Sequence, residues 1–208
     1  MIVCINGNIG SGKSTLLKKL KEEGYAVYFE GLERGTWGDL LEKYYENPKR
    51  YSYLFQTVVL ADMKELYNII RLTHREDEIV FVERSHIDCL AFCTMIKDEG
   101  NMKQEEFEAF ERLFNLLYVS PDIYVTLNIP PSICLDRLQY RGRKSESSIT
   151  MNYLRRVEKY TSKCMEMDLC QGKKYTIDGK EKSPNQIKEK ILRLLTTAEQ
   201  KTKNDLSE

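Results

Sequence analysis

The sequence carries Gly7-Asn-Ile-Gly-Ser-Gly12-Lys13-Ser14 near its amino end, a segment that matches the pattern G-x-x-x-x-G-K-[ST]. The segment lies between a β-branched run, Ile2 to Asn6, and a stretch from Lys13 to Glu23 with leucines at helical spacing. Glycines allow the backbone N–H groups to wrap around phosphate oxygens, and the following helix adds the positive end of its dipole. The segment therefore predicts a phosphate-binding loop that holds a nucleoside triphosphate.

The residues of this loop differ in what they are expected to bind. Lys13 is expected to reach the β- and γ-phosphates, and the Ser14 hydroxyl is expected to bind Mg²⁺. The alternative is a glycine-rich turn that matches the pattern by chance, but a strand before it and a helix after it argue against that reading. The residues predicted to bind ATP here are Gly7, Asn8, Ile9, Gly10, Ser11, Gly12, Lys13, Ser14 and Thr15.

Strand-like and helical patterns alternate along the rest of the chain. Further strands are predicted at about 25–30, 78–83, 122–128 and 174–178. Helices are predicted at about 39–46, 50–72, 85–97, 104–118, 150–169 and 184–196, with another after Pro131. This alternation predicts an α/β fold, in which a five-stranded parallel sheet carries helices on both faces and ligands bind beyond the carboxyl ends of the strands.

Length and charge favour one domain with a local ligand site. The chain has 208 residues, with 32 Lys and Arg against 32 Asp and Glu. A neutral chain without a long basic stretch disfavours nucleic-acid binding. The longest apolar runs fall far short of the ~20 residues that cross a bilayer, so we expect no membrane segment. We expect one domain over residues 1–196 and a disordered tail over 197–208.

The cysteines favour a reducing compartment. They stand at positions 4, 89, 93, 134, 164 and 170, and none forms a Cys-x-x-Cys pair. Scattered cysteines of this kind are typical of buried free thiols rather than of disulfides or a metal site. The first residues form a predicted strand and do not resemble a secretory or organellar leader. We therefore expect a cytoplasmic protein.

Charged side chains follow three of the predicted strands. Glu30 closes the second strand and Glu83-Arg84-Ser85 closes the third, so these side chains are expected at the same sheet edge as the phosphate loop. Guanidinium groups can give bidentate hydrogen bonds to phosphate oxygens. Arginines after the fourth strand therefore predict a lid, at about 141–148, that closes on a transferring phosphoryl group. These arginines are Arg137, Arg141 and Arg143.

Taken in order, these motifs resemble those of the deoxynucleoside kinases of the non-zinc type, which include thymidine, deoxycytidine and deoxyguanosine kinases. The scattered cysteines exclude the thymidine kinase class that carries a zinc ribbon. The resemblance implies a P-loop kinase fold and ATP-dependent, Mg²⁺-assisted phosphorylation of a deoxynucleoside 5′-hydroxyl. It covers nearly the whole chain, through the phosphate loop, Leu40-Leu-Glu-x-x-Tyr45-x-Asn-Pro48, Phe55-Gln56, Glu83-Arg-Ser85 and Arg137-x-x-x-Arg141-x-Arg143-x-x-Glu146.

The resemblance also implies roles for the charged residues. Glu30 resembles the general base that takes the proton of the 5′-hydroxyl, and Arg84 resembles the residue that holds that oxygen. Glu83 resembles a carboxylate associated with Mg²⁺. Tyr45 and Glu146 resemble the pair that holds the sugar 3′-hydroxyl, and the lid arginines resemble those that hold the donor phosphates and adenine. A positioned carboxylate base typically contributes ~10²–10⁴-fold in rate, which makes Glu30 the residue on which the mechanism depends.

The resemblance further implies a pocket for the nucleobase. Gln56 resembles the amide that pairs with the base edge, since an amide offers a donor and an acceptor side by side. Phe55 resembles a pocket wall. Trp37 is a candidate to stack on the base, but it lies seven residues after Glu30 where the family pattern has five. The residues predicted to bind the nucleoside are Trp37, Tyr45, Phe55, Gln56, Val59, Met63, Asp88, Cys89, Phe92 and Glu146.

The choice of base is less well defined by the sequence. Val59 and Met63 are apolar where deoxycytidine-preferring relatives carry a smaller residue and an Arg, which favours thymidine, with deoxycytidine also used. A second base-reading position falls on Cys89 by ungapped counting, or on Asp88 if Phe92 is aligned with the family aromatic. An unpaired Asp88 would favour an amino-bearing base, because a carboxylate only accepts hydrogen bonds. Purine substrates also stay open.

Two other functions compete with this reading. The first is a nucleoside-monophosphate kinase such as thymidylate kinase, whose phosphate acceptor would need extra basic residues rather than a carboxylate at position 30. The second is a catalytically silent kinase-fold subunit that acts as an interaction module. Relatives of the resembled family usually pair through helices, so we expect a homodimer through the helices at 50–72 and 104–118. Alternatively, the apolar faces of these helices only cover the sheet.

Overall fold

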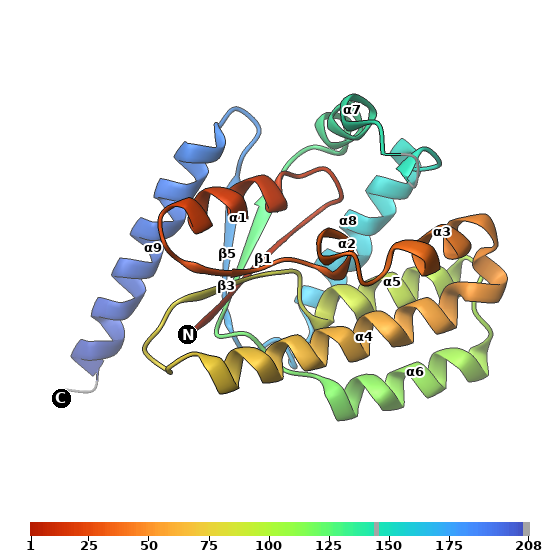
Figure 1. Ribbon diagram of the computed structural model, residues 1–208, viewed down its shortest axis with the longest axis horizontal. Helices are drawn as coiled ribbons and strands as arrows, with labels where there is room; N and C mark the ends of the chain where they lie inside the picture. Colours follow the sequence, from red (N-terminus) through yellow and green to blue (C-terminus); the bar gives the residue numbers. More distant parts are fainter. Residues whose placement is uncertain (144–145, 206–208) are drawn as a thin grey trace.

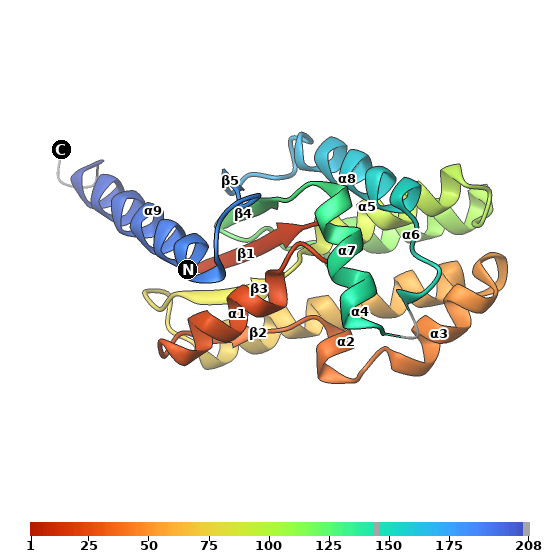
Figure 2. The ribbon, with the colours of Figure 1, turned by 90° about the horizontal axis from the view of Figure 1, so that it is seen from above.

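A single parallel sheet organises the computed structural model, which describes residues 1–143 and 146–205. The strand order is β2-β3-β1-β4-β5, and every neighbouring pair is parallel (Figures 1 and 2). The five-stranded parallel sheet predicted from the sequence is confirmed. The strands are β1 (Ile2–Gly7), β2 (Ala26–Tyr28), β3 (Val80–Glu83), β4 (Ile123–Asn128) and β5 (Lys173–Asp178).

Helices connect the strands and cover both faces of the sheet. α1 and α9 pack together on one side, whereas α4, α5 and α6 form a layer on the other side (Figures 1 and 2). The helices are α1 (Lys13–Glu22), α2 (Gly31–Arg34), α3 (Gly38–Glu46), α4 (Pro48–Thr73), α5 (His86–Asp98), α6 (Gln104–Leu117), α7 (Pro131–Arg141), α8 (Met151–Met165) and α9 (Pro184–Asp205). In the described part of the chain, none of them is both long and apolar enough to cross a membrane.

Burial on both faces explains why the central strands are almost wholly apolar. In β1, Ile2 and Cys4 join the core beneath α4 and α5, while Val3 and Ile5 join the core beneath α1 and α9. Successive side chains of a strand point to opposite faces, so a strand covered on both sides is apolar along most of its length. The carboxyl edge of the sheet is therefore the place where polar side chains gather. All six cysteines are free and buried, as expected.

The structure differs from the predicted elements at three places. β2 pairs only with β3 and ends at Tyr28, so Glu30 lies beyond the strand, at the N-cap of the short helix α2, which was not predicted. α9 continues to Asp205 rather than ending at 196, because Ala, Glu, Gln and Lys favour helix even where the apolar periodicity stops. Residues 144–145 of the predicted lid and 206–208 of the predicted tail lie outside the described residues.

Candidate active site

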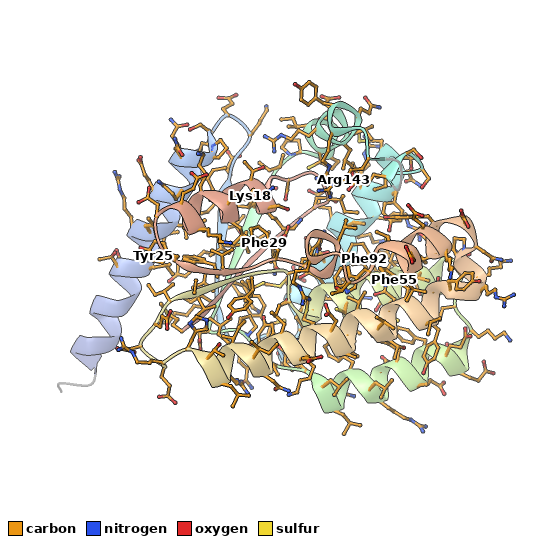
Figure 3. The ribbon with its side chains drawn as sticks, viewed as in Figure 1. Lys18, Tyr25, Phe29, Phe55, Phe92 and Arg143 are labelled. Carbon is orange, nitrogen blue, oxygen red and sulfur yellow. The ribbon has the colours of Figure 1, made fainter. Side chains whose placement is uncertain are left out.

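A cavity of about 300 Å³ opens at the carboxyl edge of the sheet. Its walls come from the phosphate loop after β1, from Glu30 after β2 and from Glu83 and Arg84 at the end of β3. Phe55, Phe92 and Arg143, which are labelled in Figure 3, all line the cavity. Every residue predicted to bind the nucleoside lines this cavity, as do the three lid arginines. Of the predicted loop residues, Ile9, Gly10, Gly12, Lys13, Ser14 and Thr15 line it, whereas Gly7, Asn8 and Ser11 do not.

The phosphate loop has a conformation that requires glycine. Gly10 has a φ of 79°, and a Cβ at this position would lie 2.6 Å from the carbonyl oxygen of Cys134 in α7. Lys13 is only 5% exposed, and its Nζ donates to the carbonyl oxygens of Gly7 at 3.3 Å and Asn8 at 3.0 Å. Burial and the nearby Arg84 lower the pKa of Lys13. The lysine is thus held in the loop by the loop's own backbone.

Glu83 and Ser14 form the second polar element of the cavity. The Ser14 hydroxyl donates to Glu83 Oε1 at 2.8 Å. Glu83 Oε2 is buried and accepts no hydrogen bond within the described chain. Burial and the neighbouring carboxylate of Glu30 raise the pKa of Glu83, although Lys13 and Ser14 oppose the shift. A buried carboxylate oxygen without a donor, next to a hydroxyl, has the donor set expected of a site for a hard cation.

Arg84 links two carboxylates across the cavity. Its Nε donates to Glu30 Oε2 at 2.8 Å, and its Nη1 donates to Asp88 Oδ1 at 3.0 Å. The side chains of Arg84 and Glu30 are only 8% and 15% exposed. Burial alone would raise the pKa of Glu30, but the charges of Arg84 and Lys13 outweigh it, so this pKa is lowered. Glu30 is therefore an ionised carboxylate at neutral pH.

The backbone of Arg84 is strained. Its φ is 66°, and it is the one non-glycine residue with positive φ among residues 1–143 and 146–205. A side chain in this region costs of order 1–3 kcal/mol, and such residues persist where surrounding contacts hold them. Burial lowers the pKa of the guanidinium, but Glu30 and Asp88 raise it by more, so Arg84 stays charged.

Asp88 lines the cavity but is not an unpaired carboxylate. It is 1% exposed, Oδ1 accepts from Arg84, and Oδ2 accepts from the Ser85 backbone N–H at 2.9 Å. Asp88 was expected to favour an amino-bearing base only if it had no hydrogen-bond donor. Arg84 and Ser85 already donate to it, so this condition is not met. Cys89 lines the same cavity, and burial raises the pKa of its thiol.

Aromatic side chains form another part of the cavity wall. The Phe55 ring stacks on Tyr44 at 5.3 Å between centroids and meets the edge of Trp37 at 6.1 Å. Trp37 Nε1 donates to Asp62 Oδ2 at 3.1 Å, which fixes the indole in this wall despite its unusual spacing from Glu30. Gln56 is only 4% exposed and lines the cavity, and its amide has no hydrogen-bond partner in the described part of the chain.

The lid arginines gather around Glu146 and the phosphate loop. Arg137 Nη1 donates to the Ser11 carbonyl oxygen at 3.1 Å. Arg141 at the end of α7 makes a two-pronged ion pair with Glu146, one arm of which joins Nε to Oε2 at 3.0 Å. Arg143 Nη1 lies 3.6 Å from the same carboxylate. Glu146 therefore holds two of the arginines predicted to bind the donor.

Comparison with known proteins identifies the family. A family model described as deoxynucleoside kinase matches residues 3–200. This chain belongs to the deoxynucleoside kinase family. The family uses ATP as phosphoryl donor and a nucleoside as acceptor, and the chain is accordingly a kinase.

Two relatives and one solved structure show what this deoxynucleoside kinase is similar to. A deoxynucleoside kinase homologue of Frog virus 3 (isolate Goorha) is 31% identical over 153 residues, which cover 74% of this chain and 76% of that protein. Deoxycytidine kinase 2 of Gallus gallus is 28% identical over 184 residues, which cover 73% and 69%. The solved structure of deoxyadenosine kinase from M. mycoides matches with a TM-score of 0.82 at 21% identity, covering 95% of this chain and 100% of that one. This last likeness shows the fold alone.

The cavity of the kinase also includes residues that the motifs did not identify. Tyr44 of α3 and Tyr153 of α8 both line it. Leu41 and Tyr44 could have been found from the apolar spacing of α3, since both lie on its buried face. Tyr153 follows the lid without any motif, and Leu32 lies in a segment expected to be a polar loop. The sequence alone gave no signal for these last two residues.

Proposed function

We propose that this kinase transfers the γ-phosphoryl group of ATP to the 5′-hydroxyl of a deoxynucleoside, with Glu30 as general base. The observation that carries the proposal is the position of Glu30, an ionised carboxylate in the same cavity as Lys13 and 2.8 Å from the Arg84 guanidinium. A base must lie within hydrogen-bond reach of the proton that it takes, and Glu30 lines the same cavity as the residues of the phosphate loop.

The proposed transfer divides the work among three residues. The 5′-hydroxyl proton passes to a Glu30 oxygen as the hydroxyl oxygen forms its bond to the γ-phosphorus, and the bond to the bridging oxygen of ADP breaks. Arg84 holds the attacking oxygen, and Lys13 binds the phosphates after leaving the carbonyl oxygens of the loop. The lid arginines then give their hydrogen bonds to the donor phosphates.

Mg²⁺ fits the Ser14 and Glu83 pair. The unpaired buried oxygen of Glu83 and the Ser14 hydroxyl are hard oxygen ligands, which Mg²⁺ prefers. No cluster of three or more His, Cys, Asp or Glu stands ready for a metal in the part of the chain that the structure describes. This favours a cation held mainly by substrate phosphates and water, with one carboxylate nearby. When bound, it would neutralise charge that develops on the phosphates.

The nucleoside is proposed to enter between the aromatic wall and the charges. The Gln56 amide, buried and without a partner among the described residues, supports pairing with the base edge. Tyr45 and Glu146 are proposed to hold the sugar 3′-hydroxyl, and Val59 and Met63 favour thymidine, with deoxycytidine also accepted. Relatives named deoxycytidine, deoxyguanosine and thymidine kinase leave the base preference to experiment.

A panel of four deoxynucleosides and their 5′-monophosphates, each with ATP and Mg²⁺, tests the proposed function. We expect turnover of deoxynucleosides, with the highest kcat/KM for thymidine. Turnover of the monophosphates alone would favour a nucleoside-monophosphate kinase such as thymidylate kinase. Absence of ATP binding would favour a silent interaction subunit.

A homodimer and a cytoplasmic location complete the proposal. Exposed apolar side chains lie on α4 and α6, which pack against each other: Leu54, Val58, Ile69, Leu72 and Leu116. A second copy would remove this surface from water, which supports pairing through these helices. Six buried free thiols suit a reducing compartment. Sedimentation velocity tests the dimer, and a monomer at micromolar concentration would refute it.

A further inference from the structure

Arg84 is held from several sides, and the contact from Asp88 has no role in the chemistry described so far. Arg84 lies just after β3, in the left-handed region, with its backbone N–H bonded to the Ile5 carbonyl oxygen. Its guanidinium donates from Nε to Glu30 and from Nη1 to Asp88. The guanidinium carbon also lies 5.3 Å from the centre of the Phe92 ring. The plane of the guanidinium is thus fixed by two carboxylates and a ring.

Asp88 is well placed to act on Arg84 because its own position is fixed. It lies at the third position of α5, where its Oδ2 accepts from the Ser85 backbone N–H at 2.9 Å and faces the Ser85 hydroxyl at 3.3 Å. This capping contact ties the carboxylate to the start of the helix. Its Oδ1 then reaches back to Arg84, four residues earlier in the chain. A side chain locked at one oxygen positions a partner at the other.

The contacts leave one part of the guanidinium for a ligand. Nε and Nη1 are used by the two carboxylates, whereas Nη2 meets no hydrogen-bond acceptor within the described chain, and Arg84 lines the cavity. Because a guanidinium is planar, fixing two of its nitrogens fixes the direction of the third. Nη2 is the donor group that would meet an oxygen entering the cavity.

We propose that Asp88 is a positioning residue for Arg84, which holds the guanidinium so that Nη2 meets the acceptor oxygen, and that it does not read the nucleobase. This inference rests on the proposed function, in which Arg84 binds that oxygen. The base is then recognised by the Gln56 amide and by neighbouring side chains such as Met63 and Cys89. Asp88 affects the rate for every deoxynucleoside equally, because the 5′-hydroxyl is common to all of them.

Two variants of Asp88 test the inference. Asp88→Asn keeps the shape of the side chain but removes its charge. Asp88→Glu keeps the charge, and Glu also caps helices well at this position, but the carboxylate moves. We expect both to lower kcat about 10- to 100-fold, the effect of losing a charge-assisted hydrogen bond. We expect the KM for ATP and the ratio of kcat/KM between thymidine and deoxycytidine to stay as in the wild type.

Glu106→Gln provides a matched control for loss of the negative charge at a helix-capping position. Glu106 accepts from the Lys103 backbone N–H at 2.9 Å at the same position of α6, and it does not line the cavity. We expect this variant to keep kcat, and its melting temperature gives the effect of losing the charge at such a position. A loss of kcat in the Asp88 variants at temperatures where both remain folded separates positioning from folding.

Three outcomes separate the hypotheses. A change of at least about tenfold in the thymidine to deoxycytidine ratio would overturn the inference and make Asp88 a base-reading residue. An unchanged kcat in both Asp88 variants would overturn it as well. If the wild type itself phosphorylates none of the four deoxynucleosides, the proposed function fails, and that result is seen before any variant is compared.

Discussion

Replacing Glu30 by Gln tests the mechanism most directly. The substitution keeps the shape of the side chain but removes the group that accepts the proton. A positioned base contributes ~10²–10⁴-fold, so kcat should fall by that factor, which corresponds to about 3–5 kcal/mol of barrier. The KM for ATP should change little, because the Glu30 carboxylate bonds Arg84 and not the phosphate loop.

The structure also limits how much stability this change can cost. Glu30→Gln removes one buried ion pair, but Arg84 keeps its bond to Asp88 at 3.0 Å and so is not left as an uncompensated charge. The expected loss is therefore that of one charge-assisted hydrogen bond, about 1.5–3 kcal/mol. For a chain of this size each kcal/mol lowers Tm by about 2–4 °C. The variant should stay folded at 25 °C.

The assay compares kcat, ATP affinity and Tm of three proteins: the wild type, Glu30→Gln and Glu42→Gln. Glu42 is exposed on α3 and does not line the cavity, so its variant measures the effect of losing one negative charge. We expect Glu42→Gln to match the wild type. If Glu30→Gln keeps a kcat close to that of the wild type, with normal Tm, the carboxylate is not the base and the reasoning is refuted.

Three further predictions concern pH, metal and thiols. Arg84 and Lys13 lower the pKa of Glu30, so the acid limb of kcat/KM should lie below the ordinary Glu value of about 4.3. Stability from the ion pair is then present above that pH and is lost as the pH falls through the folded-state pKa; a rate that already falls near pH 6 would contradict this. Ser14→Ala should raise the Mg²⁺ concentration for half-maximal rate about tenfold, by loss of one oxygen ligand, and an unchanged Mg²⁺ titration would argue against the site. All six cysteines are buried, and burial raises the pKa of Cys89, so Ellman's reagent should react slowly with the native kinase and with six thiols in denaturant; rapid reaction of the native protein would contradict the core described here.

The sheet and the phosphate loop could be predicted because local sequence determines them. The loop needs glycine at positions such as Gly10, where φ is positive and α7 leaves no room for a side chain. The strands bury both faces, which produces apolar runs that are easy to recognise. Strand alternation then places Glu30 and Arg84 at the same edge as Lys13, and all three line one cavity.

The remaining features depend on contacts between distant residues. No local pattern tells that Asp88 gives one oxygen to Arg84 and the other to Ser85, so counting from the Arg-Ser dipeptide could not distinguish a base reader from a partner of the guanidinium. Tyr153 of α8 lines the same cavity as Tyr44 of α3, although the two residues lie far apart in the sequence. β2 ends at Tyr28, opposite Val82 of β3, and its own sequence does not specify this end.

The bonds from Lys13 to the carbonyl oxygens of Gly7 and Asn8 have a consequence for product release. A buried ammonium that lost every acceptor when ADP departed would make departure costly. Here the lysine exchanges phosphate oxygens for the carbonyl oxygens of the loop as the nucleotide leaves. Its ammonium group therefore always has hydrogen-bond acceptors. The empty enzyme is thereby kept ready for its next donor, with a binding loop that does not have to refold between turnovers.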